Sequence, residues 1–175
     1  MEFFDVVRSR QSIRKFLPKP VEPDALRRVL AAAVQAPSAG NLQAFQVFMI
    51  DQPELKRRLA EAAGNQSSIL QAPVVLVFCA DPERAAARYG ARGELFCIQD
   101  ATIACAYAQL AATAVGLSSV WLGVAFEPES VQEALSLGNG LWPIVLLPIG
   151  YAAEQPARTT RRDLRELCRE LPPEV

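Results

Sequence analysis

The sequence predicts a single α+β domain over residues 1–175. Helical and strand patterns follow one another without the strict βαβ alternation of a parallel α/β fold. Residues 74–80 form an unbroken apolar run, which is typical of a strand covered on both faces. A chain of 175 residues can bury a substantial core, and no repeat, linker or low-complexity tract divides it.

The N-terminal elements follow from local signals. Residues 2–10 have the apolar spacing of a short amphipathic helix. A second helix is expected to begin at Glu22, because Pro23 and acidic residues occupy its first turn, and to end before Pro37. We then expect a strand over 45–51, a helix over 53–63, the apolar strand over 74–80 and a charged, exposed helix over 82–92.

The C-terminal elements begin with a long Ala-rich helix over 94–115. Gly116 follows it in the position that a left-handed helix cap requires. Residues 101–126 carry no charge and are long enough to span a bilayer. Because their Ala, Ser and Thr residues give little insertion free energy, we expect a buried helix and a strand over 119–126, with no membrane span. A helix beginning at 127–129, a strand over 143–150 and a basic helix over 158–169 complete the prediction.

Composition excludes several classes of function. The chain has 18 basic and 19 acidic residues, so it has no general attraction to nucleic acid or to acidic membranes. It contains no histidine, which excludes Ser-His and Cys-His nucleophiles and His-ligated metals. The four cysteines form no C-x-x-C pair, so no metal site is expected, and buried free thiols are predicted at Cys79, Cys97 and Cys105. The N-terminus is acidic and has no apolar signal core, which favours a cytoplasmic location.

Two basic clusters are candidates for anion binding. In the first, Arg10, Ser12 and Arg14 alternate along an extended segment and would present two guanidinium groups and a hydroxyl on one side. Ile13 and Phe16 could anchor this segment to the core. The second cluster contains Arg158, Arg161, Arg162 and Arg165. Either cluster could be a solvated surface; alternatively, Arg161 or Arg162 folds back and completes a phosphate site.

Two further segments suggest a flat polar ligand. Pro37-Ser38-Ala39-Gly40-Asn41-Leu42-Gln43 joins a helix pattern to a strand pattern and could be an ordinary turn, but its amides can also donate to and accept from a pyrimidine-like ring. In the segment 116–123, Trp121 could be a core aromatic residue, and Gly123 permits a close approach of the backbone to a ligand. The chain has no G-x-G-x-x-G or Walker A loop, so phosphate binding would depend on arginines.

Four motifs, in order, resemble those of the nitroreductase-like family of FMN-dependent oxidoreductases. The opening R-R-S-x-R-x-F pattern appears as Arg10-Gln11-Ser12-Ile13-Arg14-Lys15-Phe16, with Gln11 in place of an arginine. The P-S-x-x-N-x-Q loop is complete at 37–43, and G-L-x-x-x-W-[IL]-G is present at 116–123. The closing pattern appears as Gly150-Tyr151, Pro156, Arg161-Arg162 and Leu164.

The resemblance implies a nitroreductase-like fold, in which helices flank a central mixed or antiparallel sheet, and an interlocked homodimer with FMN at the subunit interface. The phosphate and the pyrimidine edge would be held by one chain, and Ser38, Asn41 and Gln43 would come from its partner. Asn65 or Gln66 is a further candidate at the ring. The cofactor-binding residues implied are Arg10, Gln11, Ser12, Arg14, Pro37, Ser38, Asn41, Gln43, Trp121, Leu122, Gly123, Arg161 and Arg162.

The resemblance also implies an NAD(P)H-dependent oxidoreductase that reduces a nitroaromatic, quinone or enone acceptor in a ping-pong cycle. FMN carries this chemistry, so no catalytic side chain is required, in agreement with the absence of histidine. The alternatives are a flavin dehydrogenase or oxidase that uses a peptide or small molecule without nicotinamide, and a non-catalytic flavin-binding protein. Ala44-Phe45 replaces the Pro-Trp that often follows the loop glutamine in this family. The sequence of the loop 37–43 with Ala44 is similar to that of relatives that oxidise azoline rings on peptides.

Overall fold

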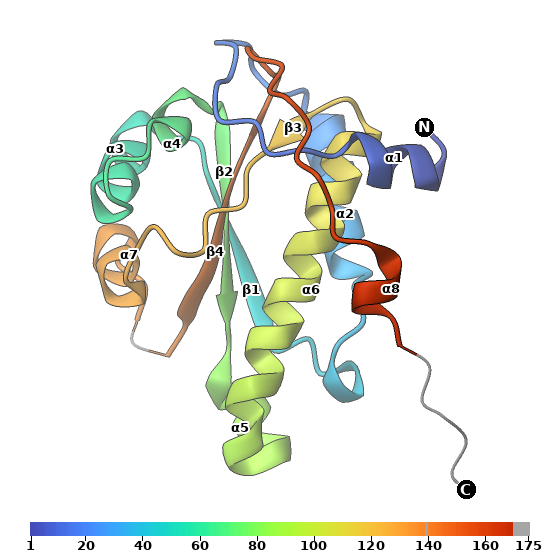
Figure 1. The fold of residues 1–175 in the computed structure, drawn as a ribbon. Coiled ribbons are helices and arrows are strands. Elements are labelled where there is room, and N and C mark those ends of the chain that lie inside the picture. Colours follow the sequence, from blue (N-terminus) through green and yellow to red (C-terminus); the bar gives the residue numbers. More distant parts are fainter. Residues whose placement is uncertain (139, 170–175) are drawn as a thin grey trace, which may run out of the picture.

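The computed structural model describes residues 1–138 and 140–169 and places a sheet between two layers of helices (Figure 1). The sheet is antiparallel, with the strand order β1-β2-β4-β3. The strands are β1 (Phe45–Ile50), β2 (Val74–Ala80), β3 (Ser118–Ser119) and β4 (Trp142–Gly150). The α-helices are α1 (Phe3–Ser9), α2 (Pro23–Val34), α3 (Pro53–Ala62), α4 (Ser67–Gln71), α5 (Pro82–Tyr89), α6 (Gly93–Ala114), α7 (Pro128–Leu135) and α8 (Leu164–Leu167), with short 3-10 turns η1 (Ala39–Asn41) and η2 (Gly90–Arg92).

The central strand β2 is buried on both faces, as its apolar run predicted. Successive side chains of a strand point to opposite faces. Leu76 and Phe78 therefore pack with α2 and α6, whereas Val75 and Val77 pack with α3, α4 and α7. The α+β architecture expected from the sequence is confirmed, with helices on both faces of an antiparallel sheet.

The long helix α6 is the core helix of one layer. Together with α5 it forms a segment, Pro82–Ala114, that is long and apolar enough to cross a membrane by length and composition alone. Instead, α6 packs against α2, β2 and β4 through small buried residues such as Ala104 and Ala108. Its outer face leaves Leu95 and Tyr107 exposed. The expected buried helix is confirmed, but one of its apolar sides is left uncovered within a single chain.

The strand predicted over 119–126 is wrong in its length. Only Ser118 and Ser119 pair continuously with β4, and Leu122 then exchanges backbone hydrogen bonds with Leu146 before the chain bends over residues 123–126. β3 lies at the sheet edge, with β4 on one side and an isolated bridge between Ser12 and Ser119 on the other. The Trp121 indole lies over Gly123, and this turn ends the pairing.

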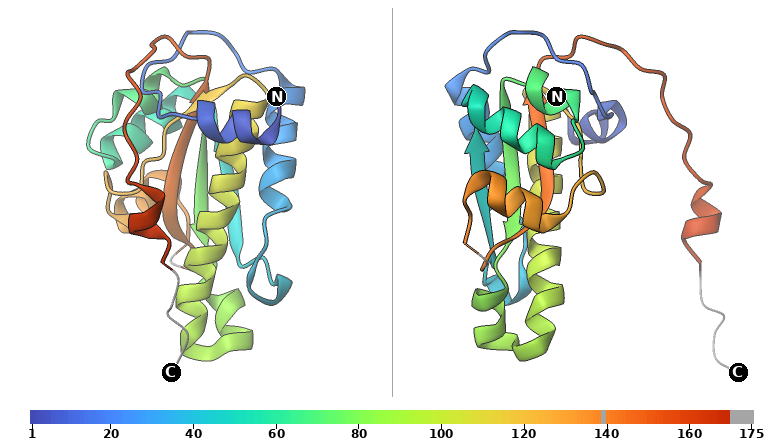
Figure 2. Two further views of the ribbon diagram at one scale, coloured as in Figure 1. Left: turned by 45° about the vertical axis from the view of Figure 1, so that its right-hand side comes forward. Right: turned by 90° about the vertical axis from the view of Figure 1, so that its left-hand side faces the viewer.

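The basic helix predicted over 158–169 is also mostly absent. Residues 158–163 are extended, and the helix is limited to α8, whose start is fixed by the Asp163 carboxylate accepting a hydrogen bond from the Arg165 N–H (2.8 Å). Figure 2 shows this C-terminal tail running away from the body of the molecule. The exposed helix predicted over 82–92 ends at Tyr89, because Gly90 takes a positive φ of 56°. The five-residue helix α4 was not predicted.

Candidate functional site

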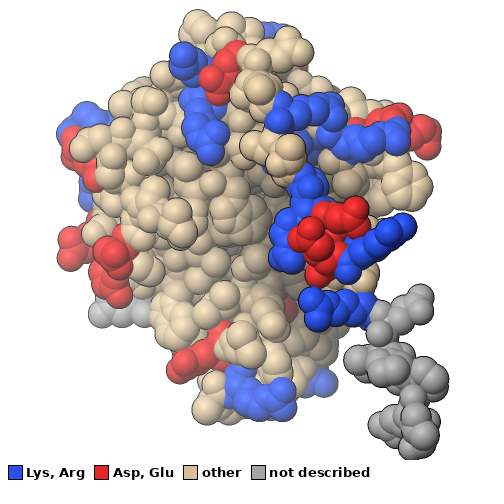
Figure 3. Space-filling view, viewed as in Figure 1, with Lys and Arg blue, Asp and Glu red and all other residues tan. Residues whose placement is uncertain are grey.

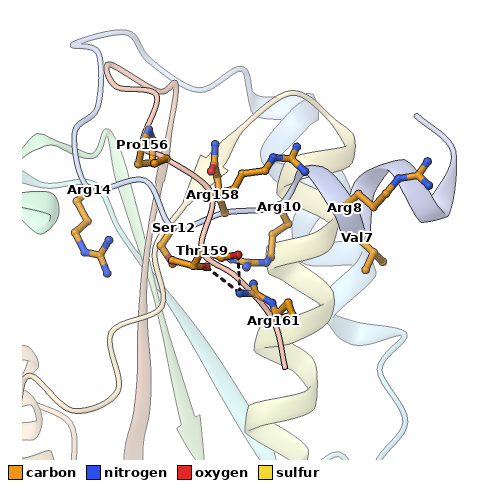
Figure 4. Close-up of a pocket in the computed structure, with 11 residues that line it drawn as sticks. Val7, Arg8, Arg10, Ser12, Arg14, Pro156, Arg158, Thr159 and Arg161 are labelled. Atoms are coloured by element: carbon orange, nitrogen blue, oxygen red, sulfur yellow. Dashed lines mark hydrogen bonds between the residues drawn. The ribbon is translucent and has the colours of Figure 1, made fainter. Parts of the chain in front are cut away.

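A cavity of about 600 Å³ lies where the segment after α1 meets the C-terminal tail (Figure 4). Figure 3 shows that Lys and Arg side chains gather at this side of the molecule. Both basic clusters singled out in the sequence contribute to the same cavity, although Arg14 and Arg158 lie 144 positions apart along the chain. The lining residues are Val7, Arg8, Arg10, Gln11, Ser12, Arg14, Pro156, Ala157, Arg158, Thr159 and Arg161.

The segment 10–16 is held in an extended form from both sides. Ser12 forms a parallel bridge with Ser119, and the Ile13 N–H donates to the Ser119 carbonyl (3.0 Å). Ile13 and Phe16 are buried in the core, as the sequence predicted. On the other side, the Glu154 carboxylate accepts hydrogen bonds from the N–H groups of Arg14 (2.6 Å) and Lys15 (3.1 Å). The sheet and the start of the tail therefore fix the backbone that carries Arg10, Ser12 and Arg14.

The cavity holds uncompensated positive charge. Among the described residues, Arg10, Arg14, Arg158 and Arg161 form no ion pair, whereas Arg8 pairs with Asp5. Burial, followed by the neighbouring Arg161 guanidinium, lowers the pKa of Arg10. Since a guanidinium remains charged in proteins, the shift expresses first the cost of burying this charge and second its repulsion by Arg161, and a bound anion would offset both. The donor set is suited to a phosphate group.

The two neighbouring arginines of the tail are in different environments. The Arg161 guanidinium lines the cavity and donates to the Thr159 hydroxyl (2.8 Å). Figure 4 shows it facing Arg10 beside Ser12. Arg162 does not line the cavity and forms an ion pair with Glu166 (2.9 Å), four residues further on. Of the two candidates, the geometry therefore brings Arg161 to the cluster.

Gln11 lies between this cavity and a smaller one of about 300 Å³. Its Oε1 atom is buried and accepts no hydrogen bond from the described residues. A buried acceptor without a donor is costly, so it favours a ligand or a neighbouring chain that supplies one.

The loop 37–43 has an unusual backbone. Gly40, Asn41 and Gln43 all take positive φ values, of 53°, 56° and 52°. Side chains other than glycine and asparagine rarely adopt this conformation, so its occurrence at Gln43 indicates a constrained segment. Asn41 is exposed, and the Gln43 amide donates to the Asn41 carbonyl (3.0 Å).

Ser38 and Asp100 hold this loop in place. The Ser38 hydroxyl accepts a hydrogen bond from the Gln43 N–H (3.0 Å), which closes the loop on itself. Asp100, buried on α6, accepts from the N–H groups of Ala39 (2.9 Å) and Ala44 (3.2 Å). The Ser38 side chain is thus already used within its own chain.

Within one chain, the loop 37–43 and the arginine cavity lie at opposite ends of α6. Asp100 contacts the loop, whereas Thr113 lines the smaller cavity together with Arg10 and Gln11. At a rise of about 1.5 Å per residue, the thirteen steps from Asp100 to Thr113 correspond to roughly 20 Å. The two segments that suggested one ligand therefore do not line one common pocket within a single chain.

The segment Trp121–Gly123 continues from the strand that pairs with Ser12. Trp121 is partly buried and packs in the core of the α2–α6 layer, whereas Leu122 is buried in the opposite layer. Gly123 is exposed, and a Cβ atom there would lie 3.0 Å from the Trp121 indole nitrogen. These three residues do not line the arginine cavity; they follow Ser119, which is bridged to Ser12 of that cavity.

Asp100 and Glu154 are positioning residues that were not predicted from the sequence. Asp100 carried a signal, since it is the last acid before a long uncharged stretch on an apolar helix. Glu154 carried no comparable signal, because its partners Arg14 and Lys15 lie about 140 residues away along the chain.

Comparison with known proteins agrees with this arrangement. The sequence pattern described as "Nitroreductase family" matches residues 7–70 and 62–151. The chain belongs to the nitroreductase family. A Thermus thermophilus protein named "NADH dehydrogenase" is 35% identical, over 83% of this chain and 84% of that protein. A Bacillus subtilis "FMN reductase [NAD(P)H]" is 34% identical over 86% of this chain, which spans 66% of that relative. The "oxygen-insensitive NADPH nitroreductase" of Salmonella typhimurium is 31% identical, over 83% of this chain and 64% of that protein.

Solved structures show the same fold for this nitroreductase-family chain. NfrA2 of B. megaterium superimposes with a TM-score of 0.87 at 29% identity, over 97% of this chain and 74% of that one. A nitroreductase family protein of Clostridium novyi gives a TM-score of 0.79 at 28% identity, over 88% and 87% of the two chains. The family and fold implied by the four sequence motifs are thereby confirmed.

Proposed function

We propose that this nitroreductase-family protein is an NAD(P)H-dependent FMN oxidoreductase that acts as a homodimer. The observation that carries the proposal is the cavity in which Arg10, Arg14 and Arg161 stand without carboxylate partners among the described residues. Names of relatives, such as "FMN reductase [NAD(P)H]", support the choice of cofactor and of reductant.

The residues present fit FMN in two parts. Arg10, Ser12, Arg14 and Arg161 would hold the phosphate, because two or more guanidinium groups and a hydroxyl match the geometry of a dianion. The Gln11 Oε1 atom, buried without a donor among the described residues, could accept from a polar edge of the ligand. The segment Trp121–Gly123 would lie beside the ring and present backbone groups to it.

The second part of the site would come from the partner chain. Because about 20 Å of α6 separates the loop 37–43 from the arginine cavity, we infer that Asn41 and Gln43 contact a ring bound there from another subunit. The surface offers apolar area for such a dimer: Phe3, Phe4 and Val7 of α1 are exposed, as are Leu95 and Tyr107 of α6. Burial of contiguous apolar surface is a main driving force of permanent association.

Bound FMN would supply two-electron hydride chemistry, taking electrons from NAD(P)H and passing them to a nitroaromatic, quinone or enone acceptor. The protein's own task is then to bind, orient and exclude water. Arg10 or Arg14, if its guanidinium reaches the pyrimidine edge, would stabilise negative charge there. No side chain needs to act as an acid or a base, in keeping with the absence of histidine.

The test is the absorption spectrum of the purified protein, followed by anaerobic titration with NADH and with NADPH. We expect a yellow dimer that retains one FMN per chain and is bleached within the dead time of mixing by at least one nicotinamide. A colourless protein that does not take up added FMN would overturn the proposal. A yellow protein that no nicotinamide reduces would instead support a flavin oxidase or a non-catalytic flavin carrier.

A further inference from the structure

We propose that Asp100 is a positioning residue of the flavin site, which holds the loop 38–44 in the conformation that presents Asn41 and Gln43 to the ring. This inference rests on the proposed function, since it assigns a role within the same site. Asp100 itself lies beneath the loop and would not contact the ligand.

The two oxygens of the Asp100 carboxylate accept hydrogen bonds from opposite ends of the loop. Oδ1 accepts from the Ala39 N–H at 2.9 Å, and Oδ2 accepts from the Ala44 N–H at 3.2 Å. The Asp100 side chain on α6 thereby fixes the distance between Ala39 and Ala44, and Gly40, Asn41 and Gln43 lie between these two residues.

The burial of the Asp100 carboxylate has a cost in folding free energy. The residue is 2% exposed, and among the described residues no Lys or Arg pairs with it. A buried carboxylate without a cation is stabilised only by the hydrogen bonds that it accepts. Both of its side-chain hydrogen-bond partners among the described residues are main-chain N–H groups of this loop, so its carboxylate supports the loop.

The loop requires such support because its backbone is strained. Asn41 and Gln43 both have left-handed backbone conformations. This conformation is tolerated by asparagine but is unfavourable for glutamine. Residues in such conformations persist only where their surroundings over-determine them, and they cluster at ligand-binding sites.

Two arginines of α5 complete the support from the opposite side. The Arg84 guanidinium donates to the Leu42 carbonyl (2.7 Å), and the Arg88 guanidinium donates to the Gly40 carbonyl (3.1 Å). A side chain at Gly40 would meet the Tyr89 hydroxyl and displace that side chain, and the positive φ of 53° also favours glycine at this position. Charged side chains therefore hydrogen-bond to the main chain of the loop, and the Asn41 side chain is exposed and accessible to a ligand.

The test compares Asp100→Asn and Asp100→Ala in the full-length protein. Asparagine keeps the volume and one acceptor oxygen, whereas alanine removes both acceptors. Gln109→Leu is the matched control, because Gln109 is also a buried polar residue of α6 but its side chain makes no hydrogen bond to this loop. The measurements are the Kd for FMN and for riboflavin, the visible spectrum of the bound flavin, and amide hydrogen exchange over residues 38–44 without flavin.

We expect the FMN Kd to rise about tenfold or more in Asp100→Ala and less in Asp100→Asn, with a shifted flavin spectrum and faster exchange in the loop. The ratio of the riboflavin Kd to the FMN Kd should stay at the wild-type value, since the arginine cavity is intact. Gln109→Leu should leave the loop exchange and the flavin spectrum as in the wild type.

Unchanged FMN affinity and spectrum in both Asp100 variants would overturn the inference, even if their thermal stability fell. Equal effects of Gln109→Leu would also overturn it, because they would indicate a general disturbance of α6. Failure of the wild-type protein to bind flavin would refute the proposed function, and that result is read independently of the variants.

Discussion

Arg10 is predicted to have opposite effects on ligand binding and on the stability of the flavin-free protein. Hydrogen bonds to a charged group contribute about 1.5–3 kcal/mol, and a factor of ten in Kd corresponds to about 1.4 kcal/mol. Arg10→Gln should therefore raise the FMN Kd by about 10- to 150-fold. The reason is that Arg10 lines the cavity and is not neutralised by a carboxylate of the described residues.

The same substitution should not destabilise the protein without flavin. The pKa of Arg10 is lowered by burial and by the Arg161 charge, so removal of the guanidinium relieves a repulsion. Because Arg10 is only partly buried, solvent screens this term, and the gain is at most about 0.5 kcal/mol. For a chain of this size, such a gain corresponds to a rise in Tm of about 1–2 °C.

The assay is fluorescence titration with FMN, paired with thermal unfolding of the flavin-free protein. Arg27→Gln is the control. Arg27 lies on α2, forms an exposed ion pair with Asp24 and does not line the cavity. It should change neither quantity appreciably. A lower Tm together with an unchanged FMN Kd in Arg10→Gln would refute the reasoning, because Arg10 would then be a structural residue.

Two other outcomes are expected from the core. In Gly93→Ala the new Cβ would lie 2.7 Å from main-chain atoms of Ala85 and Ala86, so α5 and α6 must separate. We expect the free energy of unfolding, measured with denaturant, to fall by about 1–3 kcal/mol. The control is Gly138→Ala, whose new Cβ would meet nothing within 4 Å and which should be close to neutral. In thiol titration with a disulfide reagent at pH 8, the native protein should react rapidly at Cys168 alone, since burial raises the pKa of Cys79 to about 12 and also raises those of Cys97 and Cys105. All four thiols should react after unfolding, and rapid reaction of two or more in the native protein would contradict the buried positions.

Elements with strong local signals could be predicted from the sequence. β2 was identified by its apolar run, and the start of α2 by Pro23 and its acidic first turn, because those signals act over a few residues. The edge strand β3 and the helix α8 could not be sized in the same way. Their lengths depend on hydrogen bonds to Leu146 and on the capping by Asp163, rather than on periodicity alone.

The candidate site divides along the same line. The residue types that bind an anion were recognisable at Arg10, Ser12 and Arg14, and the structure brings them to one cavity with Arg161. The spacing of Arg162 and Glu166 is compatible with a local ion pair, but the preference for Arg161 also depends on the path of the tail, which brings Arg161 to a cavity lined by residues near the N-terminus. The role of Asp100 depends on contacts with residues about 60 positions earlier, so it could emerge only from the fold.

The length of α6 has a consequence for how this chain can diverge. Insertion of one residue between Asp100 and Thr113 would turn the far end of the helix by about 100° and lengthen it by about 1.5 Å. In the proposed dimer, the loop above Asp100 and the cavity beside Thr113 would then no longer match the twofold-related chain, and flavin binding would be lost at both sites. Changes in chain length should therefore be confined to segments outside this helical interval, such as the bend over residues 123–126 and the extended tail.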